Sequence, residues 1–165
     1  MSELDKLTQD TIEEGGVLAL LYFDIHGTDK DTMVQLGTGL VQKVLNEDGV
    51  VFARGEIDEP MEQEDLFSTS LELKVLTRDV VSFAEVCGNF SPFSMEILEP
   101  QEFKLPVSSM QDLFMFISST THDYKKYIVQ KLASPDKGEE YAKNLKARAE
   151  LGKRLLGKKE GESNE

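Results

Sequence analysis

The 165-residue chain lacks several features on which functional assignments usually rest. It has no tryptophan, a single cysteine (Cys87) and two histidines, His26 and His122. One cysteine cannot form a disulfide within the chain, which favours a reducing compartment such as the cytoplasm. These three residues also cannot supply a structural zinc site by themselves, because such a site needs a fuller set of Cys and His ligands. We expect Cys87 on the apolar stripe of a helix, where cysteine behaves as a small hydrophobic side chain.

Long hydrophobic runs and common catalytic motifs are missing as well. No apolar run approaches the roughly 20 residues that span a bilayer. The acidic residues 1–6 are not a basic segment ahead of an apolar stretch, so we expect no signal peptide. The sequence also has no Gly-x-Ser-x-Gly motif and no phosphate-binding loop. These observations disfavour a membrane protein and the enzymes that carry either of these motifs, and they favour a cytoplasmic protein.

Acidic residues dominate the composition. The formal net charge is −13, from 31 Asp and Glu against 18 Lys and Arg. Residues 1–130 hold nine basic and 24 acidic residues, a net of −15, whereas residues 131–165 hold nine and seven, a net of +2. The body should therefore repel nucleic acid, and only the basic helix expected at residues 136–159 could bind it. Contact of this helix with the acidic body of its own or a neighbouring chain fits the charge distribution best.

The most apolar run of the chain, residues 15–27, predicts a strand that is buried on both faces. Because side chains alternate along a strand, its odd-numbered residues should face one way and its even-numbered residues the other. The even-numbered side chains are Leu18, Leu20, Tyr22, Asp24 and His26.

The segments that follow predict a mixed α+β domain. A helix should begin near Asp29, and its Gly37 and Gly39 should let it lie close to a sheet. Strands are expected at residues 50–57, 66–76 and 93–98, with an acidic turn at 58–65 and a second helix capped by Asp79. This order of strand, helix, strand, strand, helix, strand resembles the ferredoxin-like split βαβ sandwich over residues 16–99. The resemblance implies an antiparallel sheet whose first and third strands are central.

The remainder of the chain predicts helices, and the whole divides into four parts. Residues 108–132 fit one kinked helix or two, because the hydroxyl residues 118–121 interrupt the apolar stripe, and Ser134-Pro135 should start a last helix. The predicted parts are an N-terminal arm or short helix (1–14), a ferredoxin-like α+β domain (15–105), a C-terminal helical extension (106–159) and a disordered tail (160–165).

The even-numbered face of the first strand is the best candidate site, because neighbouring strands should add charged side chains to it. Carboxylates, an imidazole and a guanidinium on one surface could bind a polar ligand or a metal ion. The alternative is a half-covered face of ordinary ion pairs. The candidate ligand-binding residues are Tyr22, Asp24, His26, Arg54, Glu72 and Glu96, and the candidate metal ligands are Asp24, His26 and Glu56.

Leu18 and Leu20 would form an exposed apolar patch if nothing covered this face. We expect either the C-terminal helices or a second subunit to cover it, and we favour a homo-oligomer. The predicted contact residues are Leu18, Leu20, Tyr141, Leu145 and Leu155.

These patterns favour a non-enzymatic cytoplasmic module that binds a small ligand or assembles with partners. One alternative is a metal-dependent enzyme that uses the carboxylate and histidine cluster, and another is RNA binding through the basic final helix. No cofactor is predicted, although this cluster could hold a divalent metal ion.

Overall fold

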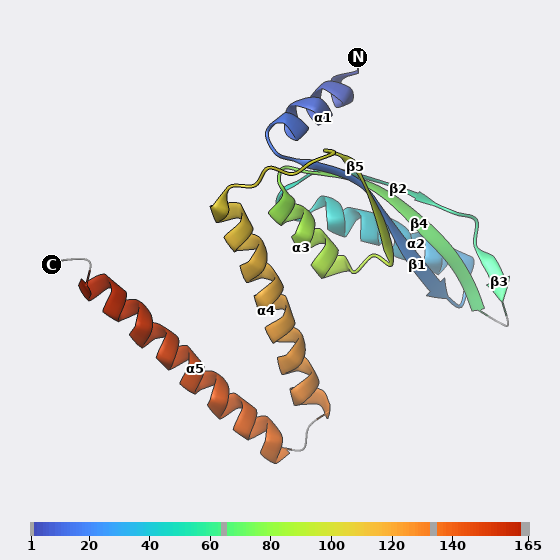
Figure 1. Cartoon of the computed structure of the whole chain (residues 1–165). Coiled ribbons are helices and arrows are strands. Elements are labelled where there is room, and N and C mark those ends of the chain that lie inside the picture. Colours follow the sequence, from blue (N-terminus) through green and yellow to red (C-terminus); the bar gives the residue numbers. More distant parts are fainter. Residues whose placement is uncertain (1, 64–65, 133–134, 163–165) are drawn as a thin grey trace. The chain divides into compact units, whose positions relative to one another are not determined.

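Figure 1 shows the computed structural model of the chain, which describes residues 2–63, 66–132 and 135–162; the side chains of 63, 135, 137 and 155–162 are outside this description. The chain divides into two compact units, Met1–Ile117 and Ser118–Glu165. The first unit contains seven Lys and Arg against 23 Asp and Glu, a net of −16, and the second contains eleven against eight, a net of +3. The elements are α1 (Glu3–Glu13), β1 (Val17–Gly27), α2 (Lys30–Leu45), β2 (Val50–Ile57), β3 (Met61–Gln63), β4 (Leu66–Thr77), α3 (Val80–Phe90), β5 (Ser94–Glu99), α4 (Val107–Leu132) and α5 (Pro135–Glu162).

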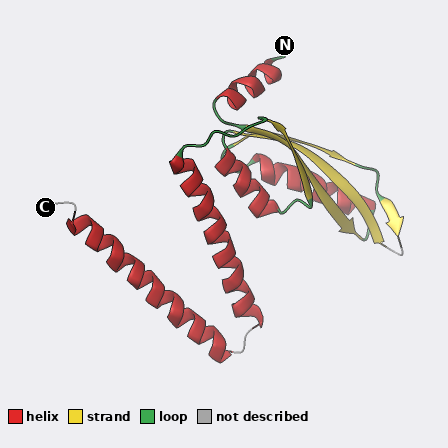
Figure 2. Cartoon of the chain, in the orientation of Figure 1, coloured by secondary structure: helices red, strands yellow, loops and turns green. Residues whose placement is uncertain are grey.

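The strands form one antiparallel sheet, in the order β2-β4-β1-β5, so β1 and β4 are interior. Helices α2 and α3 lie against one face of this sheet (Figure 2). The predicted mixed α+β class is therefore confirmed. One element differs from the prediction, because the segment expected as a polar turn contains β3, which pairs with the start of β4. Backbone pairing with an existing strand gives this short acidic segment its extended form.

The hydrophobic core lies between the sheet and its two helices. Odd-numbered residues of β1 face this core, and Leu21 is fully buried there. The prediction that the strand is buried on both faces is wrong at its far end, where Asp24 and His26 are exposed. Met33 and Val44 from α2 and Val86 from α3 are also fully buried. The other fully buried apolar side chains of this cluster are Val17, Ala19, Leu71, Leu73 and Val75.

Local side-chain bonds start the helices as the sequence predicts. The Asp29 carboxylate accepts hydrogen bonds from the Thr32 amide at 2.8 Å and the Thr32 hydroxyl at 2.7 Å, which caps α2. The Asp79 carboxylate likewise accepts from the Ser82 amide at 2.7 Å and caps α3. The predicted Asp79 cap is confirmed, and so is the helix start near Asp29.

The two glycines of α2 have different environments. A Cβ added at Gly37 would lie 2.6 Å from Ile57 Cδ1 on the sheet, so this glycine lets the helix approach closely, as predicted. A Cβ at Gly39 would meet nothing within 4 Å. The prediction of a close approach is wrong for Gly39, because this residue points away from the sheet.

Helix α4 is continuous from Val107 to Leu132, which resolves the choice between one helix and two. The hydroxyl run at 118–121 therefore does not break the helix. Ser134 and residues 163–165 of the expected tail lie outside the described residues, and the four predicted part boundaries remain predictions. Within the described part of the chain, no helix is long and apolar enough to cross a membrane.

Candidate functional site

Strand pairing places the predicted ligand-binding residues on one face of the sheet. Tyr22 of β1 pairs with Glu72 of β4, which pairs with Glu56 of β2. One row away, Leu20 pairs with Lys74, which pairs with Arg54. Paired residues of neighbouring strands point to the same face. Glu96 pairs with Leu20, and Asp24 and His26 continue the same face along β1.

Helix α1 covers the Leu18 end of this face, and Leu18 is only 6% exposed. At the Leu18 end, the covering element is therefore α1 of the same unit. Contact of this face with the C-terminal helices or a second subunit stays a prediction. A tight turn returns α1 toward the sheet: Gly15 has φ +106°, and the Gly16 amide donates to the Thr11 carbonyl at 2.8 Å. The Gly15-Gly16 pair was the sequence signal for this turn.

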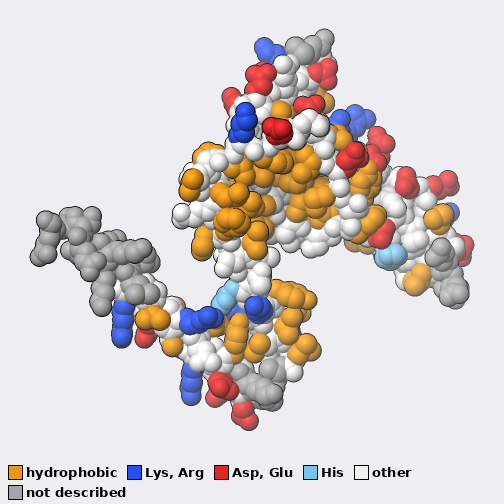
Figure 3. All heavy atoms as spheres, in the orientation of Figure 1, with side chains coloured by type: hydrophobic (Ala, Val, Ile, Leu, Met, Phe, Trp, Pro, Cys, Tyr) orange, Lys and Arg blue, Asp and Glu red, His pale blue; other side chains and the backbone are white. Residues whose placement is uncertain are grey.

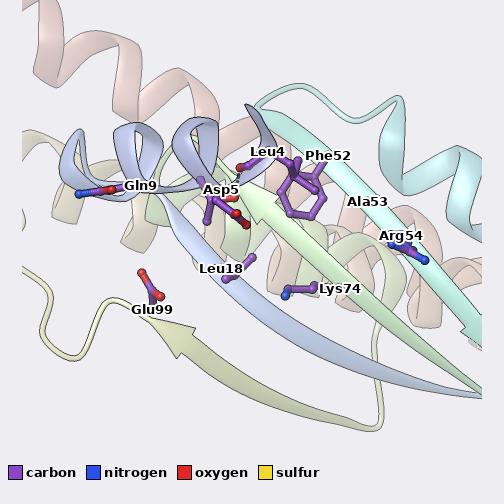
Figure 4. Close-up of a pocket in the computed structure, with 10 residues that line it drawn as sticks. Leu4, Asp5, Gln9, Leu18, Phe52, Ala53, Arg54, Lys74 and Glu99 are labelled. Atoms are coloured by element: carbon purple, nitrogen blue, oxygen red, sulfur yellow. Dashed lines mark hydrogen bonds between the residues drawn. The ribbon is translucent and has the colours of Figure 1, made fainter. Parts of the chain in front are cut away.

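A groove of about 730 Å³ lies between α1 and the sheet (Figure 4). Its apolar surface comes from α1 and two strands, and Leu4 of α1 remains 48% exposed there. Apolar surface that is still open to solvent can be buried by a ligand. The lining residues are Leu4, Asp5, Thr8, Gln9, Leu18, Phe52, Ala53, Arg54, Lys74 and Glu99.

Two of the seven basic residues of the sheet unit line this groove. Arg54 and Lys74 are register partners on β2 and β4, and like charges placed opposite each other destabilise a strand pair. Within the described residues, neither has a carboxylate within 4.0 Å. Figure 4 shows Lys74 beneath α1 near Leu18, with Arg54 farther along the groove. Their charges are therefore available to an anion.

Asp5 lines the groove with Lys74 and could neutralise it, but its carboxylate is engaged elsewhere. It accepts from the Ser2 amide at 2.8 Å, and the Ser2 hydroxyl accepts from the Asp5 amide at 3.1 Å, forming a capping box at the start of α1. Hydrogen bonds from Ser2 hold the pKa of Asp5 below its ordinary value, and Lys74 adds a smaller electrostatic contribution. Asp5 therefore stabilises α1 while acting on Lys74 only at longer range.

The next row of paired residues on this face, Tyr22 with Glu72 and Glu56, is acidic rather than basic. Desolvation raises the pKa of Tyr22, and the negative charges of Glu72 and Glu96 raise it further. The Tyr22 ring is packed near Phe93, with centroids 6.4 Å apart. Tyr22, Glu72 and Glu96 do not line the groove, so of the predicted ligand set only Arg54 belongs to it.

Asp24 and His26 line a separate pocket of about 360 Å³ at the far end of β1, together with Asp58 and Glu59. Glu56 does not line this pocket. Among the described residues, no group of three or more His, Cys, Asp or Glu side chains could hold a metal ion. The divalent metal site remains a prediction.

The remaining candidate residues have simpler environments. Burial raises the pKa of the Cys87 thiol to about 11, which suppresses the reactive thiolate. Leu20 is half-buried on the sheet, and Tyr141 and Leu145 are half-buried in the helical unit. The side chain of Leu155 lies outside the described residues.

Comparison with known proteins identifies a family. The chain belongs to the MJ0538 family, because the model of that family matches residues 18–147. The matched range begins in β1 and ends within α5, and it leaves α1 outside. No curated protein matches the chain significantly, and neither does any solved structure.

Proposed function

We propose that this protein is a non-enzymatic module that binds a small organic anion with an apolar body. The proposed site is the groove between α1 and the sheet. The observation that carries the proposal is the placement of Arg54 and Lys74 beside open apolar surface, as two adjacent cations with no carboxylate of the described residues within 4.0 Å.

The size and chemistry of the groove support this ligand class. Its volume of about 730 Å³ falls in the range of small-molecule sites, which combine apolar walls with a few polar groups. Leu4, Leu18 and Phe52 would contact the apolar body, and Lys74 and Arg54 would bind the charged head. A hydrogen bond to a charged group contributes about 1.5–3 kcal/mol, enough to select an anion over its neutral analogue.

Charge at the rim of the groove favours a monoanion. Asp5 and Glu99 line the groove together with the two cations, so its lining is close to neutral overall. A ligand with one carboxylate could contact Lys74 and Arg54 while its apolar body passes between the acidic groups. A ligand with several negative charges would be repelled by Asp5 and Glu99.

Titration with octanoate tests the proposal, with changes in backbone amide NMR shifts as the readout. Octanoate should shift amides of α1, β2 and β4, whereas the octyltrimethylammonium cation, which has the same chain, should not. The double variant Arg54→Gln/Lys74→Gln should weaken octanoate binding by about 10-fold or more, because it removes the charge-assisted bonds. Lys30→Gln/Lys104→Gln removes the same charge from the same unit outside the groove, and it should leave binding unchanged.

Two results would contradict the proposal. The first is equal binding of octanoate and its cationic analogue, because the cations would then contribute nothing. The second is equal weakening by the groove variant and the control variant, because binding would then follow net charge rather than this site.

We further propose that the sheet unit is a variant of the ferredoxin-like sandwich. With β3 set aside as an insertion in the hairpin, the order of the remaining elements supports this architecture. The expected homo-oligomer and cytoplasmic location also stand as proposals. Sedimentation equilibrium tests the first of these, and a monomer at all protein concentrations would contradict it.

A further inference from the structure

The helical unit, Ser118–Glu165, contains a groove of its own. The groove has a volume of about 580 Å³ and lies between the second half of α4 and α5. Its lining residues are His122 and Lys126 from α4 and Leu145, Lys146, Arg148 and Ala149 from α5.

Basic side chains from both helices converge on this groove. His122 and Lys126 are four residues apart, so they lie on the same side of α4. Lys146 and Arg148 approach from α5, and the lining residues that the structure describes include no carboxylate. Within the described residues, Lys126, Lys146 and Arg148 have no carboxylate within 4.0 Å. Three permanent positive charges therefore line one cavity, and none of them has a close counterion in the described part of the chain.

We propose that this groove binds the phosphate groups of a ligand. Lys and Arg are the residues that most often recognise phosphate, and Arg can bind two of its oxygens at once. The net charge of +3 on this unit favours such a ligand, whereas the sheet unit, at −16, repels it. Figure 3 shows Lys and Arg side chains on the surface of the helical unit. The site is separate from the groove beneath α1, so this inference does not depend on the proposed function.

Exposed tyrosines on the other sides of α4 favour a single-stranded nucleic acid, whose flexible backbone extends beyond the groove, over an acidic protein surface. Tyr124 is 66% exposed and Tyr127 is 58% exposed, and both lie on α4 within two residues of Lys126, but neither shares the groove side of the helix with His122 and Lys126. Aromatic side chains next to cations are the combination that single-stranded RNA recognises, through base stacking and phosphate contacts. An acidic protein would use the cations but would leave the tyrosines without stacking partners.

Fluorescence anisotropy with a labelled uridine oligonucleotide tests this inference on the full chain. The triple variant Lys126→Gln/Lys146→Gln/Arg148→Gln should bind the oligonucleotide at least about 20-fold more weakly than the unchanged protein. Lys6→Gln/Lys30→Gln/Lys104→Gln removes the same charge from the sheet unit, and it should change the affinity less than about 2-fold. For three phosphate contacts, affinity should fall about 20-fold between about 50 mM and 200 mM salt.

A second experiment distinguishes binding of a nucleic acid from binding of phosphate groups alone. Tripolyphosphate should displace the oligonucleotide if phosphate recognition dominates, and Tyr124→Ala/Tyr127→Ala should then weaken only the oligonucleotide. Binding of the oligonucleotide or of tripolyphosphate supports a phosphate site in this groove, provided that the triple variant of Lys126, Lys146 and Arg148 loses that binding. The inference is overturned if neither ligand binds at about 50 mM salt, or if both triple variants lose binding equally. Binding of an acidic protein fragment in place of both phosphate ligands would also overturn it.

Discussion

Gly16 should determine whether α1 remains packed over the sheet. A Cβ added at this position would lie 2.6 Å from the carbonyl oxygen of Thr77 and 2.7 Å from that of Thr11. Both atoms belong to the backbone, so a side-chain rotation cannot relieve the overlap. The Gly16→Ala protein must therefore shift α1, β4 or both.

The cost of this shift should be about 1–3 kcal/mol of unfolding free energy, the usual range for overpacking. In a protein of this size, a loss of about 2 kcal/mol lowers the melting temperature by about 4–8 °C. The Gly39→Ala variant is the matched control, because an added Cβ there meets nothing within 4 Å. An alanine in this helical interior should instead stabilise the protein by about 0.5–1 kcal/mol.

Thermal unfolding monitored by circular dichroism measures both effects, and octanoate titration shows whether the groove survives. Gly16→Ala should lower the melting temperature and weaken octanoate binding together, whereas Gly39→Ala should raise the melting temperature without changing binding. A Gly16→Ala protein as stable as the unchanged protein, with the same octanoate affinity, would refute the argument that this turn fixes α1 over the sheet.

Three further predictions concern the core, a cysteine and a helix cap. Leu21→Ala should cost about 2–5 kcal/mol in urea unfolding, because the side chain is fully buried, and a loss below about 1 kcal/mol would contradict its core position. Burial raises the pKa of Cys87 from 9.0 to about 11. At about pH 8 the folded protein should therefore react with a disulfide reagent about 100-fold more slowly than the unfolded chain, because it holds less thiolate. Equal rates would contradict the burial of Cys87. Hydrogen bonds from Thr32 lower the pKa of Asp29, so its stabilising effect should be present above its ordinary pKa of 3.8 and should be lost as the pH falls through the lower folded value. A carboxyl NMR titration of Asp29 with a midpoint at or above 3.8 would contradict this prediction.

Residues near one another in sequence predicted much of the sheet unit. The alternation around Leu21 identified the core face of β1, and Asp29 and Asp79 identified two helix starts. These features depend on side-chain period and on bonds across three residues, so a single sequence contains them. β3 was missed because it lies within the acidic segment 58–65 and its strand form depends on pairing with β4.

The candidate site was only partly predictable, for a related reason. The alternation correctly placed Arg54 on the same face as Tyr22, since strand register depends on that period. Lys74 was not among the candidate residues, and neither were the α1 residues Leu4 and Thr8. Their role depends on where α1 packs after the glycine turn, which is a long-range contact that residue spacing alone does not specify.

The most direct test of the central claim is a crystal structure of the protein with octanoate bound. The account predicts the carboxylate within hydrogen-bonding distance of Lys74 or Arg54, with the alkyl chain against Leu4, Leu18 and Phe52. Octanoate bound elsewhere, with the groove beneath α1 filled by side chains of the protein itself, would contradict the account.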